Sequence, residues 1–322
     1  MNLFSNTDSK KLWVTNLPHL IYGVVAPIFD SHTDSILVTD GWGTAFKSIR
    51  LRRLDLSTGQ EMATVRTGTP VRCVAFDNAG STLMAANDHR LMLLDRSTLA
   101  VVQEWRSKVP RYSDYIVWQG DLVLLKNWLA PALSRFDTNS SRVSRLNMGP
   151  CDGMYQQPNS DHVLILSGKE GRLSFFNIKT HKVDLRVDTP QFLNSKFSCC
   201  SNRLYLALGN PFNQTDSSIS RFREAQTIRI YDLSNSMRIV DVRADQPFED
   251  FWVSDSESQV ILCNKNEIRV CEVVGSHLHC RKVTKLSSGF QVATVITERR
   301  IAIGSYHEDS RSILGAFQYG GP

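Results

Sequence analysis

Five residues of the chain are candidates for proton-transfer chemistry, because they bring imidazole and carboxylate groups together. His89 follows Asp88, and His307 precedes Glu308, so each imidazole has a carboxylate as its neighbour in the chain; Asp40 is a further carboxylate in a short polar segment. Imidazole exchanges protons near neutral pH, and an adjacent carboxylate can orient it as a general acid or base. These residues indicate one hypothesis, an acid/base site for a small-molecule substrate.

A second set of residues has the composition of a partner-binding surface, in which aromatic and cationic side chains are enriched. Its members are Trp42, Lys126, Trp128, Phe212, Arg221, Phe222, Arg223 and Tyr306. An alternative for the two Trp residues is that they only cover the ends of a hydrophobic core. The Ser-rich segment 211–224 is also compatible with a disordered loop. Binding of a protein or another macromolecule is therefore the competing hypothesis.

Motifs for other chemistry are missing from the sequence. The segment 41–48 has Phe46 before its Lys, where a phosphate-binding loop needs a Gly. His277 and His279 lie two residues apart and could bind zinc only with further ligands from elsewhere in the chain, so no metal site is predicted and the pair is expected to face solvent. Neither a Gly-x-Ser-x-Gly elbow nor a His-Glu-x-x-His motif occurs. No cofactor is predicted.

The charge balance bears on nucleic acid as a partner. The 322-residue chain has 37 Lys and Arg residues and 32 Asp and Glu residues, with a formal net charge of +5. This excess is small and no run of five like charges occurs, so nucleic acid is less favoured than protein. A nucleic-acid site would need Arg106, Lys108, Arg111 and Lys126 to form one continuous stripe.

The cysteines and the apolar segments indicate the compartment. Seven cysteines occur without a Cys-x-x-Cys motif, and several alternate with apolar residues, as buried reduced thiols do. The N-terminal segment does not have the pattern of a secretory signal, and the longest apolar stretch is about half of what a bilayer span needs. We therefore expect a cytoplasmic protein that does not bind membranes.

A repeat in the sequence predicts where the residues of both hypotheses lie in the fold. Its plainest copy reads as four short strands, 71–77, 81–86, 90–95 and 101–105, separated by turn-forming residues. An apolar residue followed by a polar one ends the third strand of each copy, at Leu54-Asp55, Leu94-Asp95, Phe136-Asp137, Phe176-Asn177, Tyr231-Asp232, Cys271-Glu272 and Phe317-Gln318. Most of the spacings are close to the period of about 40 residues that is typical of four-stranded propeller blades.

A second series has the same period. Pro70, Pro110, Pro150 and Pro190 each precede an expected first strand. Proline lacks the N–H that a strand ladder needs, so it suits the crossover between two blades. The two series predict an all-β fold, a seven-bladed β-propeller, in one domain spanning 1–322. The expected blades are 19–68, 69–108, 109–149, 150–189, 190–245, 246–287 and 288–320, with an N-terminal strand, 11–17, completing the last blade.

The segments Arg53–Glu61 and Arg229–Ser236 resemble the strand–turn–strand units of YVTN and quinoprotein-type propellers, and WD-repeat blades are similar. The resemblance covers nearly the whole chain and specifies a fold. It departs from the WD-repeat pattern, because no Gly-His pair begins a blade and no Trp-Asp pair ends a third strand. The resemblance implies a lactonase-like or lyase-like activity if the protein is an enzyme. A quinone cofactor is not expected, since enzymes that use it are usually exported.

In a propeller, the turns from second to third strands and the crossovers between blades share one face, and loops on a rigid scaffold concentrate binding residues. The expected turns of this kind are polar and contain Asp40, Asp88-His89, Lys126 and His307-Glu308. The sequence favours a non-catalytic binding scaffold that presents this face to a protein or other macromolecular partner. The alternative is a cytoplasmic small-molecule enzyme with its acid/base site at the channel mouth.

Overall fold

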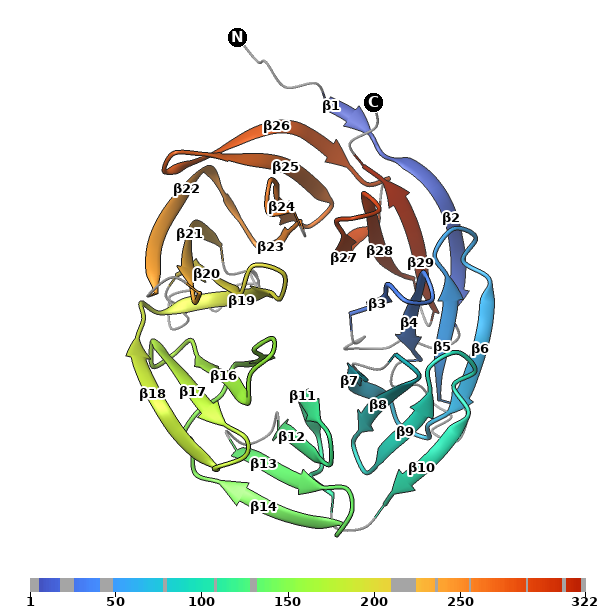
Figure 1. Cartoon of the computed structure of the whole chain (residues 1–322). Helices are drawn as coiled ribbons and strands as arrows, with labels where there is room; N and C mark the ends of the chain where they lie inside the picture. The colour runs from blue at the N-terminus through green and yellow to red at the C-terminus, as the bar shows by residue number, and fades with distance from the viewer. Residues whose placement is uncertain are drawn as a thin grey trace. The chain divides into compact units, whose positions relative to one another are not determined.

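The structure is a computed structural model of the chain. It describes residues 6–17, 26–40, 49–77, 80–106, 109–127, 132–209, 224–234, 237–254, 256–287, 289–308 and 311–319. Within the strands, the side chains of residues 6–8, 132, 307–308 and 311–312 are outside this description. The regular elements of the described residues are the strands β1 to β29 (Figure 1).

Three four-stranded antiparallel sheets, here called blades, follow one another in the first half of the chain. The first blade consists of β3 (Ile28–Asp30), β4 (Ser35–Thr39), β5 (Arg50–Asp55) and β6 (Glu61–Arg66). The second consists of β7 (Val71–Phe76), β8 (Thr82–Asn87), β9 (Leu91–Asp95) and β10 (Val101–Trp105). The third consists of β11 (Ser113–Gln119), β12 (Leu122–Asn127), β13 (Ala132–Asp137) and β14 (Arg142–Leu146).

Three further blades occupy the second half. The fourth consists of β15 (Gly153–Gln156), β16 (His162–Ser167), β17 (Arg172–Asn177) and β18 (Lys182–Asp188). The fifth consists of β19 (Phe192–Ser198), β20 (Arg203–Leu208), β21 (Ala225–Asp232) and β22 (Arg238–Phe248). The sixth consists of β23 (Asp250–Val253), β24 (Val260–Asn264), β25 (Glu267–Val274) and β26 (His277–Lys285). Strand β26 also pairs in parallel with β22 and with β1 (Asn6–Asp8), so these two blades and β1 form one nine-stranded sheet.

The last blade combines the two ends of the chain. Its order is β2-β29-β28-β27, with β2 (Lys10–Leu17), β27 (Gln291–Ile296), β28 (Ile301–Glu308) and β29 (Arg311–Gln318). An N-terminal strand therefore completes the final blade, as predicted. Together with the six blades before it, this sheet confirms the predicted seven-bladed β-propeller.

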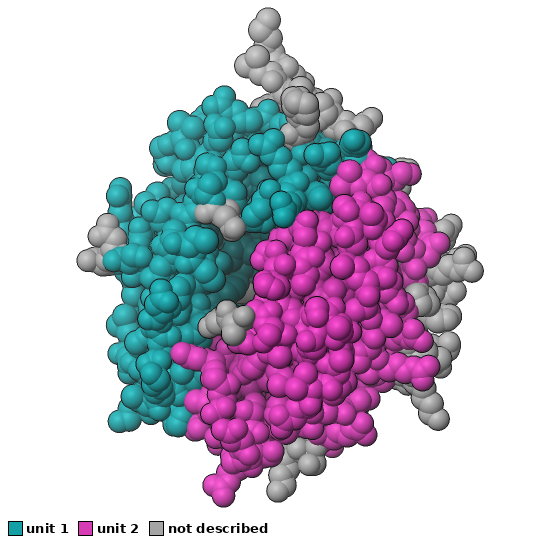
Figure 2. All heavy atoms as spheres, turned by 45° about the vertical axis from the view of Figure 1, so that its right-hand side comes forward, with its two compact units in different colours: residues 1–10, 152–302, 317–322 teal, residues 11–151, 303–316 magenta. Residues whose placement is uncertain are grey.

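The chain divides into two compact units (Figure 2). Unit 1 comprises residues 1–10, 152–302 and 317–322, and unit 2 comprises residues 11–151 and 303–316. Hydrophobic side chains fill the space between neighbouring blades within each unit. In unit 2, Leu37 of the first blade packs with Leu83 of the second, and in unit 1, Ile228 of the fifth blade packs with Leu262 of the sixth. The single-domain organisation stays a prediction.

The position of a strand within its blade follows from its residue pattern. Second strands are nearly continuous apolar runs, and β4 and β16 are buried along almost all of their length. Fourth strands alternate or are polar, and β6 and β14 are largely exposed. A strand covered on both faces needs an apolar run, whereas a strand with one solvated face needs only every second residue to be apolar.

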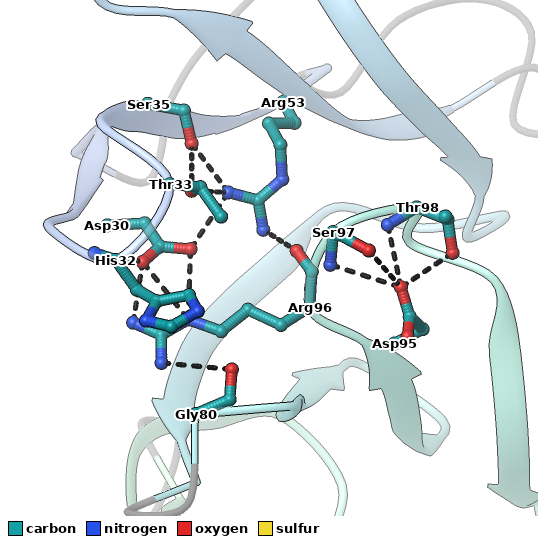
Figure 3. Close-up of polar contacts among 10 residues, drawn as sticks. All are labelled: Asp30, His32, Thr33, Ser35, Arg53, Gly80, Asp95, Arg96, Ser97 and Thr98. Carbon is teal, nitrogen blue, oxygen red and sulfur yellow. Dashed lines mark hydrogen bonds and ion pairs between the residues drawn. The ribbon is translucent and has the colours of Figure 1, made fainter.

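The apolar–polar pair that revealed the repeat is a turn device. The Oδ1 atom of Asp95 accepts hydrogen bonds from the backbone N–H groups of Ser97 and Thr98 at 3.1 and 2.8 Å (Figure 3). These bonds, with those from the two hydroxyl groups, hold the pKa of Asp95 at about 2. Asp55 and Asn177 accept the equivalent pairs of N–H bonds. The polar residue at this position therefore fixes the turn between the third and fourth strands.

Candidate functional site

The structure describes the side chains of only some predicted site residues. Those described are Asp40, Asp88, His89, Lys126 and Tyr306, the last of them partly buried in β28. His307 and Glu308 belong to the backbone of β28, but their side chains lie outside the described residues. Trp42, Trp128, Phe212, Arg221, Phe222 and Arg223 also lie outside the described residues.

Two of the expected turn positions are wrong. Lys126 lies inside β12, where it pairs with Leu133 of β13, and His307 and Glu308 end β28. In both blades the second strand continues past its expected end: β12 stays paired with β13 up to Asn127, and β28 extends to Glu308. Polar composition alone was a poor guide to the strand end.

Asp88 forms a buried ion pair with Arg72. The Asp88 side chain is fully buried in the connection between β8 and β9, and its Oδ1 atom accepts a hydrogen bond from Arg72 Nε. The other oxygen, Oδ2, is buried and accepts no hydrogen bond from the described residues. The carboxylate is thus held by a guanidinium group of β7, the first strand of the same blade.

His89 contacts an aromatic ring and not a carboxylate. Its imidazole lies edge-on to the ring of Tyr112, with the centroids 5.8 Å apart. The N–H of Tyr112 donates to the carbonyl of Asp88 at 3.2 Å, which joins this connection to the start of the third blade. Among the described residues the His89 imidazole has no hydrogen-bonded carboxylate, so the hypothesised Asp88–His89 acid/base pair does not form there.

Asp40, like Asp88, is bound to an arginine side chain. Its carboxylate accepts bonds from Arg52 Nε at 2.8 Å and from the Arg50 N–H at 3.1 Å. Arg52 also contacts Glu61. Burial lowers the pKa of Arg52, but the bonds to Asp40 and Glu61 outweigh this effect and raise it above its ordinary value. Asp40 therefore serves as the anionic partner of a permanently charged guanidinium.

Lys126 belongs to a cluster of three side chains on the third blade. Its Nζ atom lies 2.9 Å from Asp114 Oδ2 and 5.0 Å from the centroid of the Tyr115 ring. The Lys126 side chain is 13% exposed and that of Asp114 is 29% exposed. An ammonium group over an aromatic face gains cation–π attraction in addition to the ion pair.

Unit 1 contains a similar cluster that the sequence did not reveal. Lys196 of β19 has its Nζ atom 4.5 Å from the centroid of the Trp252 ring and 3.5 Å from Asp250 Oδ1. Asn194 donates to the same carboxylate oxygen. The two strands that contribute these residues, β19 and β23, are the first strands of the fifth and sixth blades. Both clusters contain one cation, one anion and one aromatic ring, and both are partly exposed.

The polar ends of second strands have a structural role. The Asn87 side-chain amide donates to the carbonyl of Thr67 at 2.9 Å, and its oxygen accepts from the backbone N–H groups of His89 and Arg90. Side-chain amides occupy the same position in two other blades, where they donate to carbonyl groups near the crossovers: Asn127 to Arg111 and Asn264 to Pro247. The 40-residue interval between Asn87 and Asn127 was the available signal for this role.

A buried charge cluster links the first and second blades (Figure 3). Asp30 is fully buried at the end of β3, where Arg96 Nη2 donates to its Oδ1 at 2.6 Å and Arg53 Nη1 donates to its Oδ2 at 2.8 Å. Arg53 also donates to Ser35 at 2.5 Å and to the carbonyl of Arg96. Arg96 comes from the turn after β9, so the cluster fastens two blades of unit 2 to each other.

This cluster, here called the Asp30 cluster, carries more positive than negative charge. One carboxylate faces two guanidinium groups, and Arg53 Nε is buried with no hydrogen-bond acceptor among the described residues. Burial raises the pKa of Asp30, but the hydrogen bonds from Arg96 and Arg53 outweigh burial and hold it at about 2. The cluster is packed inside the protein, and its hydrogen bonds hold the first and second blades together.

One Ser–His–Asp series occurs on the fourth blade. Ser160 Oγ lies 2.9 Å from His162 Nδ1, and His162 Nε2 lies 2.7 Å from Asp184 Oδ2. The hydrogen bond from His162 lowers the pKa of Asp184. However, Ser160 Oγ also accepts the backbone N–H of His162, so this hydroxyl group caps the turn before β16. The series explains the local turn without requiring catalysis.

Metal and membrane sites were sought in the part of the chain that the structure describes. No group of three or more His, Cys, Asp or Glu side chains there is arranged to hold a metal ion. His277 and His279 are both exposed on β26, with their ring centroids 6.5 Å apart. In the same part of the chain, no helix is long and apolar enough to cross a membrane.

Comparison with known proteins identifies the fold. No protein-family model and no curated protein matches the sequence. Among solved structures, the chain is similar to the β-propeller domain of Myceliophteria thermophila Cps50 (Swd1), with a TM-score of 0.67 and 13% sequence identity over 95% of this chain and 99% of that one. It is also similar to the Neurospora crassa Pan2 WD40 domain, with a TM-score of 0.68 and 11% identity over 98% of this chain and 97% of that one.

A chain in the structure of a mitotic checkpoint complex is a third similar fold, with a TM-score of 0.66 and 11% identity over 98% of this chain and 93% of that one. The fold is therefore a WD40-like β-propeller. Because the identities are this low, the likeness concerns the fold alone. The sequence lacks the Gly-His and Trp-Asp pairs of the WD-repeat pattern.

Proposed function

We propose that this chain is a non-catalytic binding scaffold that presents one loop face to a protein or other macromolecular partner. The observation that supports a binding role is that each unit has a cluster of this kind on its strands, around Lys126 in unit 2 and around Lys196 in unit 1. Each combines a cation with an aromatic ring and stays partly exposed. Aromatic and cationic side chains that are fixed by their neighbours are typical anchors of protein interfaces, because little conformational entropy is lost when they bind.

The small-molecule enzyme is less well supported. Its hypothesised base, His89, contacts Tyr112, while Asp88 and Asp40 are bound to Arg72 and Arg52. In catalytic sites an imidazole base is commonly held in place by an orienting group within hydrogen-bond reach. The described residues at these positions supply cation–carboxylate pairs, which suit a rigid surface better than proton transfer.

Nucleic acid is also less well supported than protein. Of the residues that would form a basic stripe, Lys126 is paired with Asp114, and Arg106 is paired with Glu104 at 2.9 Å. A phosphate backbone is bound by cations that are free to replace its counterions. The cytoplasmic location stays a prediction.

Affinity capture from cells with tagged full-length protein tests this proposal. Lys126→Ala and Lys196→Ala each remove the cation and leave the aromatic ring in place. Lys179→Ala is the matched control, because Lys179 forms an exposed ion pair with Asp161 at 2.9 Å in a turn between third and fourth strands. We expect a partner that is retained by wild type and by Lys179→Ala but reduced by at least one of the other two variants.

Two results would count against the proposal. Capture that neither Lys126→Ala nor Lys196→Ala reduces would show that neither cluster takes part in binding. A chain that captures no partner but retains a small molecule on purification would favour the enzyme. Melting temperatures of all three variants are needed beside the capture, so that loss of binding is not confused with loss of folding.

A further inference from the structure

Two cysteines face each other across the hairpin formed by β25 and β26. Cys271 and Cys280 are partners in the antiparallel register, and their Sγ atoms are 2.6 Å apart. Directly opposed residues in such a ladder have Cα atoms about 4.5–5.5 Å apart. This lies within the range of roughly 4.4–6.8 Å that a disulfide spans. The backbone therefore already has the spacing that a disulfide requires.

The two thiols differ in access and acidity. Cys271 is fully buried in the core between the fifth and sixth blades, whereas Cys280 is partly exposed. The contact with Cys271 lowers the pKa of Cys280, and the same contact together with burial raises that of Cys271. The thiolate is the reactive form of cysteine. An oxidant arriving from solvent therefore meets Cys280 first.

The hairpin is irregular next to the two cysteines, and this irregularity affects the direction of their side chains. The register shifts between Val270 and Cys271, so that Val270 is opposite Lys282 while Cys271 is opposite Cys280. Arg281 is the extra residue of this bulge. A bulge increases local twist and redirects side chains.

We propose that Cys271 and Cys280 are a reversible modification site, at which a peroxide converts the two thiols into a disulfide. The Cys280 thiolate attacks one peroxide oxygen, the O–O bond breaks, and the departing oxygen leaves as water, which makes Cys280 a sulfenic acid. The Cys271 sulfur then attacks the Cys280 sulfur, and the sulfenic oxygen leaves as a second water with the thiol proton. Two electrons pass from the sulfurs to the peroxide, and a dithiol reverses the reaction.

The bond would act on a strand that holds several elements together. Strand β26 pairs with β22 at residues Arg243 and Ala244, and with β1 at Asn6–Asp8. A covalent link between β25 and β26 would fix the strand on which both pairings depend. Oxidation is therefore expected to stabilise this edge of unit 1.

The test uses the full-length chain carrying Cys199→Ser and Cys200→Ser, because both of these cysteines are exposed and would form other disulfides. The protein is reduced, treated with graded hydrogen peroxide, alkylated and digested with trypsin. Arg269 and Arg281 are the flanking cleavage sites, so residues 270–281 form one peptide that contains both thiols. We expect this peptide to lose two hydrogens and to take up no alkylating reagent, before buried Cys73 or Cys151 reacts.

The following controls distinguish a reversible disulfide from irreversible oxidation of the thiols. Dithiothreitol should restore both alkylation sites, and oxidation should raise the melting temperature by a few degrees. In Cys271→Ser, Cys280 should stop at sulfenic or sulfinic acid and the melting shift should vanish. If that variant does not fold, Cys280→Ser replaces the partly exposed residue, and Cys271 should then stay reduced. The proposal is overturned if the intact peptide keeps two free thiols when Cys73 is oxidised, or if Cys280 forms sulfinic acid while Cys271 is present and reduced.

Discussion

Asp30→Asn is expected to destabilise the protein strongly, because it leaves two guanidinium groups without their carboxylate. Removing one partner of a buried ion pair costs about 3–5 kcal/mol. Arg53 is fully buried and already has one unpaired nitrogen, so water cannot replace the lost charge there. Asn keeps the shape of Asp and one acceptor oxygen. We therefore expect a loss near the lower end of this range, about 3 kcal/mol.

The pKa of Asp30 gives a second measure of the same interaction. Its folded-state pKa is about 2, below the ordinary 3.8. A lowered carboxyl pKa contributes stability that is present above the unfolded-state value and is lost as the pH falls through the folded-state value. The separation between the two pKa values corresponds to about 2.4 kcal/mol at neutral pH. About half of this contribution should remain at pH 3.

Urea denaturation of wild type and Asp30→Asn at pH 7, 5 and 3 measures both quantities. The difference in unfolding free energy should be about 3 kcal/mol at pH 7 and 5, and should shrink by roughly 1 kcal/mol at pH 3. Asp121→Asn is the control, because Asp121 is exposed in the turn before β12; it should change stability by less than about 0.5 kcal/mol. A difference below about 1 kcal/mol, or one that is unaffected by pH, would show that Asp30 does not hold a charged pair.

Two further predictions concern the turns between third and fourth strands. Gly59 has φ +70°, and a Cβ atom there would lie 2.6 Å from Trp13 Cδ2. In urea denaturation, Gly59→Ala should therefore lower the unfolding free energy by about 2 kcal/mol or more. An unchanged unfolding free energy would mean that Trp13 does not pack on this turn. Ser141 occupies the equivalent position in the third blade with φ +52°, so Ser141→Gly should raise the unfolding free energy by about 0.5–1 kcal/mol. Ser144→Gly, within β14, is the control and should lower the unfolding free energy. If both substitutions change the unfolding free energy equally, the backbone at residue 141 is not strained.

The fold was predictable because most blades repeat two local devices. In five of the seven copies an Asp or Asn follows the apolar residue at the end of the third strand and caps the turn, and several crossovers contain a Pro, so both devices leave a mark in the sequence. In the second blade the four strands end within a residue or two of their predicted ends. Because these devices depend on neighbours in the chain, one sequence was sufficient to reveal them.

The partners of the site residues were not predictable, because they depend on packing between distant segments. Arg72 and Asp88 are sixteen residues apart, and Asp30 and Arg96 are 66 residues apart in different blades. Nothing in the local sequence marks such pairs. The prediction that Lys126 lies in a turn was wrong for a related reason, since a ladder with a regular partner strand continues through a polar residue.

Polar residues at the ends of second strands therefore do not by themselves indicate a ligand site. Asn87 and Asn127 share one place in the period, and both are used to hold a crossover in position. A residue that recurs at the same place in several blades is explained by the needs of the fold. Lys196 and Trp252 form their pair across two blades and follow no such series. The fold does not require a partly exposed cation over an aromatic ring, so features of this kind are the better guide to where a partner binds.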